Sequence, residues 1–272
     1  MVSEALPADG RPLSTPAMLL AVDIGNTNVV FGVFDGTGWR HHWRVRTVRE
    51  KMADEYGVLF RGLLGERGLA MRDFERIVIA SVVPPLTGRI EEMIADESAA
   101  DPLVINHTTD TGLTFAVDNP AEVGADLIAN AVAAYQRVRG ACIVVDFGTA
   151  ATFTAVSVDA TFLGVAIAPG MNLAASALAG GTAQLPQVRL SSPTQVIGTN
   201  TVRAIQSGVM FGYVGLVEGI IDRFRAEMGT TAPVIATGGL SSLISPLTNR
   251  FSAVDPWLTL DGIRIIGERN LP

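Results

Sequence analysis

The sequence predicts an α/β protein made of two similar halves with a cleft between them. A stretch near the N-terminus, AVDIGNTNVVFGVFD, has a counterpart in mid-chain, VVDFGTAATFTAVSVD, and both place Asp-x-Gly between an apolar run and an alternating run. After each stretch, apolar runs typical of strands alternate with segments of helical spacing. The 272 residues are 48% hydrophobic and 17% charged, which is enough to bury a sizeable core. The pattern therefore favours a duplicated domain.

The first half is predicted to open with three strands and then to alternate helix and strand. The apolar run that ends at Asp23 pairs as a hairpin with the alternating run that follows it. Pro120 takes the position that opens a helix, and Gly140 takes the position that ends one. The expected elements are strands 18–22, 29–34 and 42–47, helix 53–68, strand 76–85, helix 86–97, strand 102–106 and helix 119–140.

The second half is predicted to repeat this opening. Its expected elements are strands 141–148, 151–158 and 162–170, helices 171–182 and 198–229, and strand 232–239, with 263–270 closing the chain. We expect one domain over 18–139 and a second over 140–272. Residues 1–17 contain no apolar core segment, so they are expected to be a flexible extension rather than a signal peptide or a membrane span.

The charge balance argues against partners that need a basic face. The net charge is −7, whereas binders of nucleic acid or of anionic membranes carry clustered positive charge. One local exception is WRHHWRVRTVREK, residues 39–51. We interpret it as an exposed strand with solvated arginines, because nothing else in the chain supports nucleic-acid binding. We therefore expect neither a nucleic-acid nor a membrane partner.

Cysteine and histidine usage gives no sign of a zinc site or a disulfide. The lone Cys142 lies in the apolar run ACIVVDF, which is typical of a small buried hydrophobic residue. The three histidines are not spaced as metal ligands. A reducing cytoplasm fits this usage best.

The helix expected over 198–229 carries four glycines on one side. Gly208, Gly212, Gly215 and Gly219 are spaced by 4, 3 and 4 residues. A stripe without side chains lets another backbone approach closely. Because the segment also contains Gln206 and Glu218, we expect a tightly packed helix of a soluble protein rather than a membrane span.

The repeated turn has the chemistry of a phosphate clamp. A glycine hairpin exposes backbone N–H groups and allows a phosphate to approach closely, while Asn26 and Thr27 add side-chain donors. A carboxylate beside a phosphate repels it unless a cation lies between them, so Asp23 and Asp146 imply metal ions. A single Asp-x-Gly is usually a plain turn. Two copies at matching positions favour two turns that hold the phosphates of a nucleotide from both sides.

A Gly-Gly turn near the C-terminus and an aspartate at the start of a helix are two further candidates for the nucleotide site. The stretch PVIATGGLSS runs from a strand into Gly238-Gly239, and such a turn lets an adenine or ribose lie against the backbone, although Gly-Gly after a strand is also a common loop. Asp126 falls in the first turn of a helix. It either complements the positive helix N-terminus or acts as a general base aimed into the cleft, with Gly124 admitting substrate. The sequence pattern alone does not separate these two roles.

Taken together, these motifs resemble a known family. The paired Asp-x-Gly hairpins and the Gly-Gly turn resemble the superfamily of actin, sugar kinases and heat-shock chaperone ATPases, which implies two ribonuclease-H-like halves in a duplicated actin-like ATPase fold. The ordered motifs DIGNTN, NPAEVGAD, VVDFGTAAT, AIAPGM and GTNTVRAIQSG resemble type III pantothenate kinase from residue 18 nearly to the C-terminus. That resemblance implies a phosphotransferase with an alcohol acceptor, which uses ATP to convert pantothenate to 4'-phosphopantothenate in the first step of coenzyme A biosynthesis.

The resemblance also implies roles for individual residues. Asp126 would accept the proton of the pantothenate hydroxyl, Asp146 would bind a monovalent cation (K⁺ or NH₄⁺), and Asp23 would lie near Mg²⁺. The residues implied to bind ATP are Asp23, Ile24, Gly25, Asn26, Thr27, Asn28, Val29, Val30 and Thr149. Those implied to bind pantothenate are Gly124, Ala125, Asp126, Leu127 and Thr201. A cytoplasmic homodimer is implied as well, with the substrate pocket close to the dimer contact. The glycine stripe that begins at Gly208 is a candidate for tight packing at that contact, and packing within the chain is the alternative.

Three positions depart from the family pattern. Leu127 stands where the family has an Arg that pairs with the pantothenate carboxylate, and the loss of such a contact costs roughly 1.5–3 kcal/mol. Arg203 and Arg189 are the nearest candidates by motif to replace it. Val117 and Ala151 stand where an aromatic residue and a Thr are usual.

The departures keep two other interpretations open. One is a non-catalytic homologue that binds ligand and acts through a partner. Leu127 favours this interpretation, and the three intact aspartates argue against it. The other is a kinase or phosphatase of the same superfamily with another small substrate. An Asp126 that faces the Asp23 turn across the cleft would support catalysis, whereas an Asp126 that caps its helix on the outer surface would not.

Overall fold

A computed structural model describes residues 18–270, and the expected extension 1–17 lies outside the described residues. The first sheet begins with the hairpin of β1 (Leu19–Ile24) and β2 (Asn28–Phe34), followed by β3 (Trp39–Arg46). Strands β4 (Arg76–Ser81) and β5 (Leu103–Val104) then add in parallel on the other side of β1. The resulting five-stranded order is β3-β2-β1-β4-β5. Two helices, α1 (Ala53–Gly65) and α2 (Pro84–Glu97), and the short turn η1 (Met71–Asp73) connect these strands.

The second sheet repeats the first and adds one strand. The hairpin of β7 (Cys142–Phe147) and β8 (Ala150–Val156) is followed by β9 (Thr161–Pro169), and β10 (Val234–Thr237) and β11 (Ala253–Val254) add in parallel beside β7. The order β11-β10-β7-β8-β9-β6 thus mirrors the first sheet, with β6 (Thr114–Phe115) as an extra edge. The duplication predicted from the two hairpins is confirmed in the topology of the sheets.

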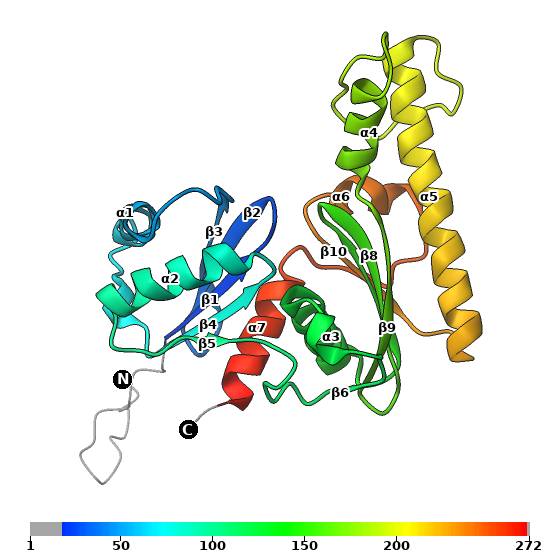
Figure 1. Cartoon of the computed structure of the whole chain (residues 1–272). Coiled ribbons are helices and arrows are strands. Elements are labelled where there is room, and N and C mark those ends of the chain that lie inside the picture. The colour runs from blue at the N-terminus through cyan, green and yellow to red at the C-terminus, as the bar shows by residue number, and fades with distance from the viewer. Residues whose placement is uncertain (1–17, 271–272) are drawn as a thin grey trace, which may run out of the picture.

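Two helices lie between the sheets and face both of them. These are α3 (Ala125–Val138) and α7 (Leu258–Arg269), which appear at the centre of Figure 1. Ile128 of α3 and Ile263 of α7 pack on the first sheet, whereas Ala131 of α3 and Leu258 pack on the second. Since β6 joins the second sheet and α7 returns to the first, the chain crosses between the halves at both places. The domain boundary at 139/140 stays a prediction.

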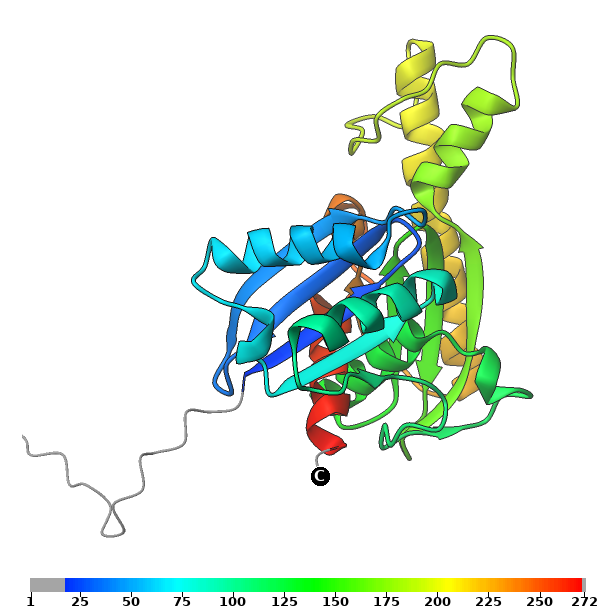
Figure 2. The ribbon, with the colours of Figure 1, turned by 60° about the vertical axis from the view of Figure 1, so that its left-hand side comes forward.

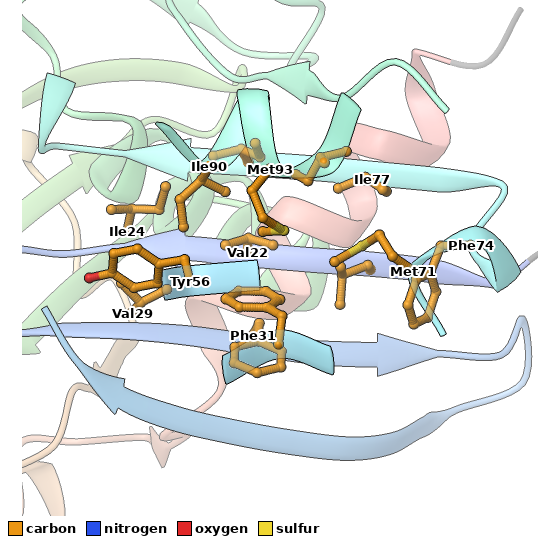
Figure 3. Packing of buried hydrophobic residues seen from close by; sticks show 14 of the residues in the cluster. Val22, Ile24, Val29, Phe31, Tyr56, Met71, Phe74, Ile77, Ile90 and Met93 are labelled. Atoms are coloured by element: carbon orange, nitrogen blue, oxygen red, sulfur yellow. The ribbon is translucent and has the colours of Figure 1, made fainter. Parts of the chain in front are cut away.

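The outer face of the first sheet is covered by α1 and α2. Alternate residues of β1 and β2, such as Val22 and Phe31, pack there against Tyr56 and Phe60 of α1 and Ile90 of α2 (Figure 3). Phe31 and Phe60 stack with ring centroids 4.2 Å apart. Alternation within a strand sends the intervening residues to the opposite face, toward α3 and α7.

Beyond the second sheet, the chain forms a lobe that projects from the body (Figure 2). It consists of α4 (Met171–Gly180) and the N-terminal part of α5 (Thr201–Met228), with the loop between them. The rest of α5, together with α6 (Ser241–Ile244) and η3 (Ser245–Leu247), covers the outer face of the second sheet. By length and composition alone, α5 could cross a membrane, but core helices of soluble proteins pass the same test.

Several sequence-based boundaries were wrong for identifiable reasons. Pro84 and Pro85 open α2 rather than end β4, which stops at Ser81, because proline suits the first turn of a helix. Pro120 begins the short turn η2 (Pro120–Glu122), and α3 starts only after Gly124. The two-residue strands β6 and β11 were not predicted, since runs so short carry no periodicity.

The glycine stripe of α5 does not pack within the chain. A Cβ placed on Gly208, Gly212 or Gly215 would meet nothing within 4 Å, and only at Gly219 would it touch a neighbour, Arg223. The tight packing that we expected on this side of the helix is therefore wrong for the single chain. The buried residues of α5, including Met210 and Val217, lie on another side.

Candidate functional site

The two Asp-x-Gly hairpins meet at the mouth of one cleft. Thr27 follows the first turn and Thr149 the second, and their hydroxyl oxygens are 2.6 Å apart, a hydrogen bond that joins the halves of the molecule. The cleft beneath has a volume of about 520 Å³. Its lining comes from both hairpins, the start of α3, α4, the Gly238–Gly239 turn and the start of α7.

The first turn is held by hydrogen bonds that leave its polar groups at the cleft. The Gly25 N–H donates to Asn28 O at 3.0 Å, and the Thr47 hydroxyl donates to Gly25 O at 2.6 Å. Arg49 Nη2 donates to Asn26 Oδ1 at 2.7 Å. The second turn has the same tight form, with Gly148 N–H donating to Ala150 O at 3.1 Å. These bonds occupy the Gly25 and Gly148 N–H groups and fix the shape of both turns, while Asn26, Thr27 and Thr149 line the cleft with polar side chains that can bind phosphate oxygens.

Strand alternation explains why both hairpin aspartates point inward. Val22 and Ile24 face the outer helices, so Asp23 between them faces α3 and α7. On β7, Val145 and Phe147 face outward and Asp146 faces inward in the same way. Each aspartate lies where its strand leaves the apolar layer and enters the cleft.

Asp126 joins these two carboxylates from the first turn of α3. It lines the cleft, and its Oδ1 accepts the backbone N–H of Leu127 at 2.7 Å. Gly124 makes room for it, because a Cβ there would lie 2.6 Å from Asp126 Oδ1. The placement of Asp126 is compatible with both roles that the sequence left open, because it interacts with the N-terminus of its own helix and also lines the cleft beside the Asp23 turn.

Burial is the main cause that raises the pKa of all three aspartates, and neighbouring carboxylates add to it at Asp23 and Asp146. Burial raises the pKa of Asp23 well above its usual value, the charges of Asp126 and Asp146 raise it further, and Arg44 opposes them. Burial, then the charge of Asp126, raises the pKa of Asp146 to about 6. Burial also raises the pKa of Asp126, against the hydrogen bond from Leu127. Carboxylates in a cleft whose pKa is raised by burial and by neighbouring charges are typical of functional sites.

A buried amide fixes Asp146 to the central helices. Asn130 of α3 is only 1% exposed; its Nδ2 donates to Asp146 Oδ2 at 3.0 Å, and its Oδ1 accepts from the Thr259 hydroxyl of α7 at 2.9 Å. Both ends of the amide are satisfied, as a buried polar group requires. The contact links the helix that carries Asp126 to the strand that carries Asp146.

The Gly238–Gly239 turn closes the cleft on the second side. Gly238 has φ +87°, a left-handed conformation that favours glycine. A Cβ on it would lie 2.6 Å from Phe147 N and would also overlap the Asp146 carboxylate. The turn therefore packs directly on the aspartate of the second hairpin, and a side chain there would displace it.

The donor set suits cations held partly by a ligand. Within residues 18–270, no group of three or more His, Cys, Asp or Glu side chains is arranged to hold a metal alone. Mg²⁺ is usually bound by one or two carboxylates together with substrate phosphates, so Asp23 beside the glycine turn fits it. Next to Asp146 in the sheet, Thr237 is 1% exposed and its hydroxyl has no hydrogen-bond partner in the described residues. An oxygen that lacks a partner beside a carboxylate fits a cation.

Most, but not all, of the residues predicted for the site line the cleft. Ile24 and Val29 belong to the outer core of the first sheet, and Ala125 and Leu127 are buried. Thr201 begins α5 in the projecting lobe. The residues that do line the cleft are Asp23, Gly25, Asn26, Thr27, Asn28, Val30, Asp126, Asp146 and Thr149.

The side chain of Leu127 belongs to an apolar core and not to the cleft lining. Leu127 packs with Val117, Phe162 and Ile235 in the core between α3 and the second sheet. A charged side chain in that direction would be desolvated, so a leucine here adds to the core.

Other residues of the cleft were not predicted. Arg44 of β3, Thr152 of β8, Asn172 and Ser176 of α4, and Trp257 before α7 all line it. Alternation along the strand 42–47 could have placed Arg44 on one face of the sheet. Its nearness to Asp23 depends on the pairing of the strands, which a single sequence does not give.

Comparison with known proteins agrees with this geometry. The family model described as type III pantothenate kinase matches residues 19–223. The type III pantothenate kinase of Moorella thermoacetica is 51% identical over 253 residues, covering 93% of this chain and 100% of that protein. That of Roseiflexus sp. strain RS-1 is 48% identical, covering 93% and 99%.

Solved structures share the fold at low sequence identity. A Baf family protein from Campylobacter jejuni has a TM-score of 0.58 at 18% identity, covering 92% of this chain and 98% of that one. The ethanolamine utilization protein EutJ from Carboxydothermus hydrogenoformans has a TM-score of 0.56 at 16% identity, covering 93% and 90%. The predicted fold class, a duplicated actin-like fold, is confirmed.

Proposed function

The chain belongs to the type III pantothenate kinase family, and we propose that the three aspartates of its cleft divide the chemistry of that family's reaction between them. The reaction is the ATP-dependent phosphorylation of pantothenate to 4'-phosphopantothenate, the first step of coenzyme A biosynthesis. The observation that supports our assignment is the meeting of Asp23, Asp126 and Asp146 in one cleft beneath two glycine turns that touch.

The first hairpin is our candidate for the phosphate-binding side. Its backbone N–H groups, with Asn26, Thr27 and Asn28, line the cleft as fixed donors. Asp23 would hold the Mg²⁺ that accompanies ATP, and this ion supplies charge stabilisation on the phosphates when bound. On the opposite side Thr149 faces the same space. Because the Thr27 and Thr149 hydroxyls bond to each other, we expect phosphates that enter between the turns to shift this contact.

Asp126 is our candidate for the general base. Its carboxylate would orient the pantothenate hydroxyl and accept its proton as the oxygen attacks the γ-phosphorus and ADP leaves. In phosphoryl transfer the protein mainly positions donor and acceptor in line, so placement matters more than basicity. The raised pKa of Asp126 and its hydrogen bond to the Leu127 N–H are compatible with this role.

Asp146 is our candidate for a monovalent cation site. Its carboxylate is fixed by Asn130, and the buried Thr237 hydroxyl beside it is free to add a second oxygen. K⁺ or NH₄⁺ there would offset the like charges of the cleft. Its positive charge would also favour the ionised carboxylate and so lower the pKa of Asp146, which burial raises.

The expected result of the first test is turnover of ATP that depends on pantothenate and that rises when K⁺ or NH₄⁺ replaces Na⁺. A coupled assay for ADP, with and without pantothenate, measures both effects. Absence of pantothenate-dependent turnover would favour a ligand-binding homologue, or a kinase for another small hydroxyl substrate. Equal turnover in all three salts would contradict only the assignment of a monovalent cation to Asp146.

We further propose a homodimer formed through the projecting lobe and α5. Apolar side chains are exposed there, including Ile197 at 84%, Val196 at 66% and Leu173 at 53%. The open side of α5 at Gly212 would let a second backbone approach. Thr201 and Arg203 lie outside the cleft of their own chain, so a partner's lobe is our candidate route by which they reach pantothenate.

For this dimer, Gly212→Leu is expected to shift the protein from dimer to monomer, because a large side chain would block the open side of α5. Sedimentation velocity measures the change. The matched control is Gly62→Leu, a glycine of α1 that also has nothing within 4 Å. Dimers of equal stability in both variants would place the interface elsewhere.

We keep the cytoplasm as the proposed location and propose neither a nucleic-acid nor a membrane partner. The net charge of −7 supports the absence of such partners, and the single, buried Cys142 supports a reducing compartment. Cell fractionation with antibody detection tests the location, and recovery in the membrane fraction would contradict it.

A further inference from the structure

The arginine-rich strand β3 places one of its side chains inside the cleft. In the first sheet, Asp23 of β1 pairs with Val30 of β2, and Val30 pairs with Arg44 of β3. Residues directly opposite one another in a sheet share a face, so Arg44 lies on the same inward face as Asp23, two strands away. The stretch interpreted as an ordinary exposed strand therefore contributes to the nucleotide site.

Arg44 has no fixed partner in this position. Of the described residues that line the cleft, it is the only one with a basic side chain. Within residues 18–270 its guanidinium makes no ion pair within 4.0 Å, although its charge lowers the pKa of Asp23. By contrast, Arg40 on the same strand is paired with Asp35. A guanidinium carries donors for several hydrogen bonds, and those of Arg44 are available to a ligand.

The guanidinium lies between the two sides of the cleft. Its Nη1 is 3.5 Å from where a Cβ on Gly239 would be, so it reaches the Gly-Gly turn of the second half. It also lies 5.9 Å from the centre of the Trp257 ring, within the range of a cation–π contact. Arg44 thus spans the space from the Asp23 side to the Gly239 side.

Trp257 is itself held in place beneath Arg44. Its ring stacks on His42, with centroids 4.2 Å apart and planes at 15°. His42 and Arg44 are two residues apart on β3, so they lie on the same face. The Trp257 backbone N–H donates to Asp255 Oδ1 at 2.9 Å. The aromatic support therefore limits where the guanidinium can go, which lowers the entropy lost on binding.

We propose that Arg44 binds the phosphate chain of ATP from the Gly239 side of the cleft, opposite the Asp23 turn. This inference rests on the proposed function. ATP carries several negative charges into a cleft that already holds three carboxylates, so a fixed cation is needed in addition to metal ions. The planar fork of arginine matches phosphate oxygens in pairs, which a point charge does not.

The test is the affinity for MgATP and MgADP, measured by isothermal titration calorimetry without pantothenate. Arg44→Ala is expected to weaken both by about 10- to 100-fold, as loss of charge-assisted hydrogen bonds does. Arg44→Lys, which keeps the charge and loses the fork, is expected to fall between the wild type and Arg44→Ala. The matched control is Arg46→Ala, which removes the same charge from the same face of β3 at a residue outside the cleft lining.

The outcomes separate this inference from the function on which it rests. Wild-type affinity in Arg44→Ala overturns the inference, as does an equal loss in Arg46→Ala, which would indicate a general effect of charge. An Arg44→Lys protein that binds as tightly as the wild type overturns the paired phosphate contact, because a point charge would then be sufficient. A wild-type protein that turns over pantothenate while Arg44→Ala binds normally leaves the proposed function intact. A wild-type protein with no MgATP binding defeats both.

Discussion

Replacing Asp126 with Asn is expected to lower kcat by about 10²- to 10⁴-fold, the usual contribution of a general base. The substitution keeps the shape of the side chain, and its amide oxygen can still accept the Leu127 N–H. What it removes is the ability to take the proton of the pantothenate hydroxyl. The steady-state rate of ADP formation, measured against pantothenate concentration, gives the loss. KM for pantothenate is expected to change far less than kcat.

Stability distinguishes this loss from simple unfolding. The folded protein raises the pKa of Asp126, mainly by burial, so ionising it costs the folded state free energy above the unfolded pKa. A neutral Asn avoids that cost, and the melting temperature of Asp126→Asn at pH 7 is expected to equal or exceed that of the wild type. The control is Asp54→Asn, an exposed aspartate in the first turn of α1, which should keep full activity. Equal kcat for Asp126→Asn and wild type would remove the base role.

The cluster of carboxylates explains why this site is costly to build. Asp23, Asp126 and Asp146 each lose hydration, and each lies in the field of at least one of the others. Only cations that arrive with the ligands, together with Arg44, offset that repulsion. A fold selected for stability alone would place apolar residues here, so the cost itself points to function.

Sequence alone identified those parts of the site that depend on local pattern. The position of Asp23 and Asp146 follows from strand alternation, and the turns after them follow from Gly25 and Gly148. Both are contained within a few consecutive residues. The repeat then located the second copy from the first, and the order of the strands in both sheets confirmed it.

The rest depends on contacts between distant segments. Arg44 comes near Asp23 only through the register of β1, β2 and β3. The link from Thr259 through Asn130 requires α7 to return across the molecule to α3. The burial of Leu127 likewise depends on the second sheet, most of whose strands follow it in the chain. Periodicity describes one element at a time and does not say which elements meet.

The close packing of α7 against α3 requires a glycine at position 262. We therefore expect Gly262→Ala to lower the free energy of unfolding more than any other substitution proposed for this protein. A Cβ on Gly262 would lie 2.8 Å from Ala129 Cα and closer still to the Ala129 carbonyl, so α3 and α7 cross backbone to backbone. Backbone atoms cannot rotate away as a side chain can. The helices would have to separate, which we expect to cost about 3 kcal/mol or more, at the upper end for overpacked cores. The gain of about 1 kcal/mol from replacing a helical glycine by alanine is too small to compensate.

Urea denaturation followed by circular dichroism measures the expected loss, with Gly62→Ala as the control. Gly62 is also a helical glycine, but a Cβ there meets nothing within 4 Å, so this variant is expected to be as stable as the wild type or slightly more so. Because α3 carries both Asp126 and Asn130, Gly262→Ala protein that still folds is expected to lose turnover as well. A Gly262→Ala protein as stable as Gly62→Ala would mean that the two helices are not in backbone contact. The position of Asp126 would then have to be set by the sheets and not by the pair of helices between them.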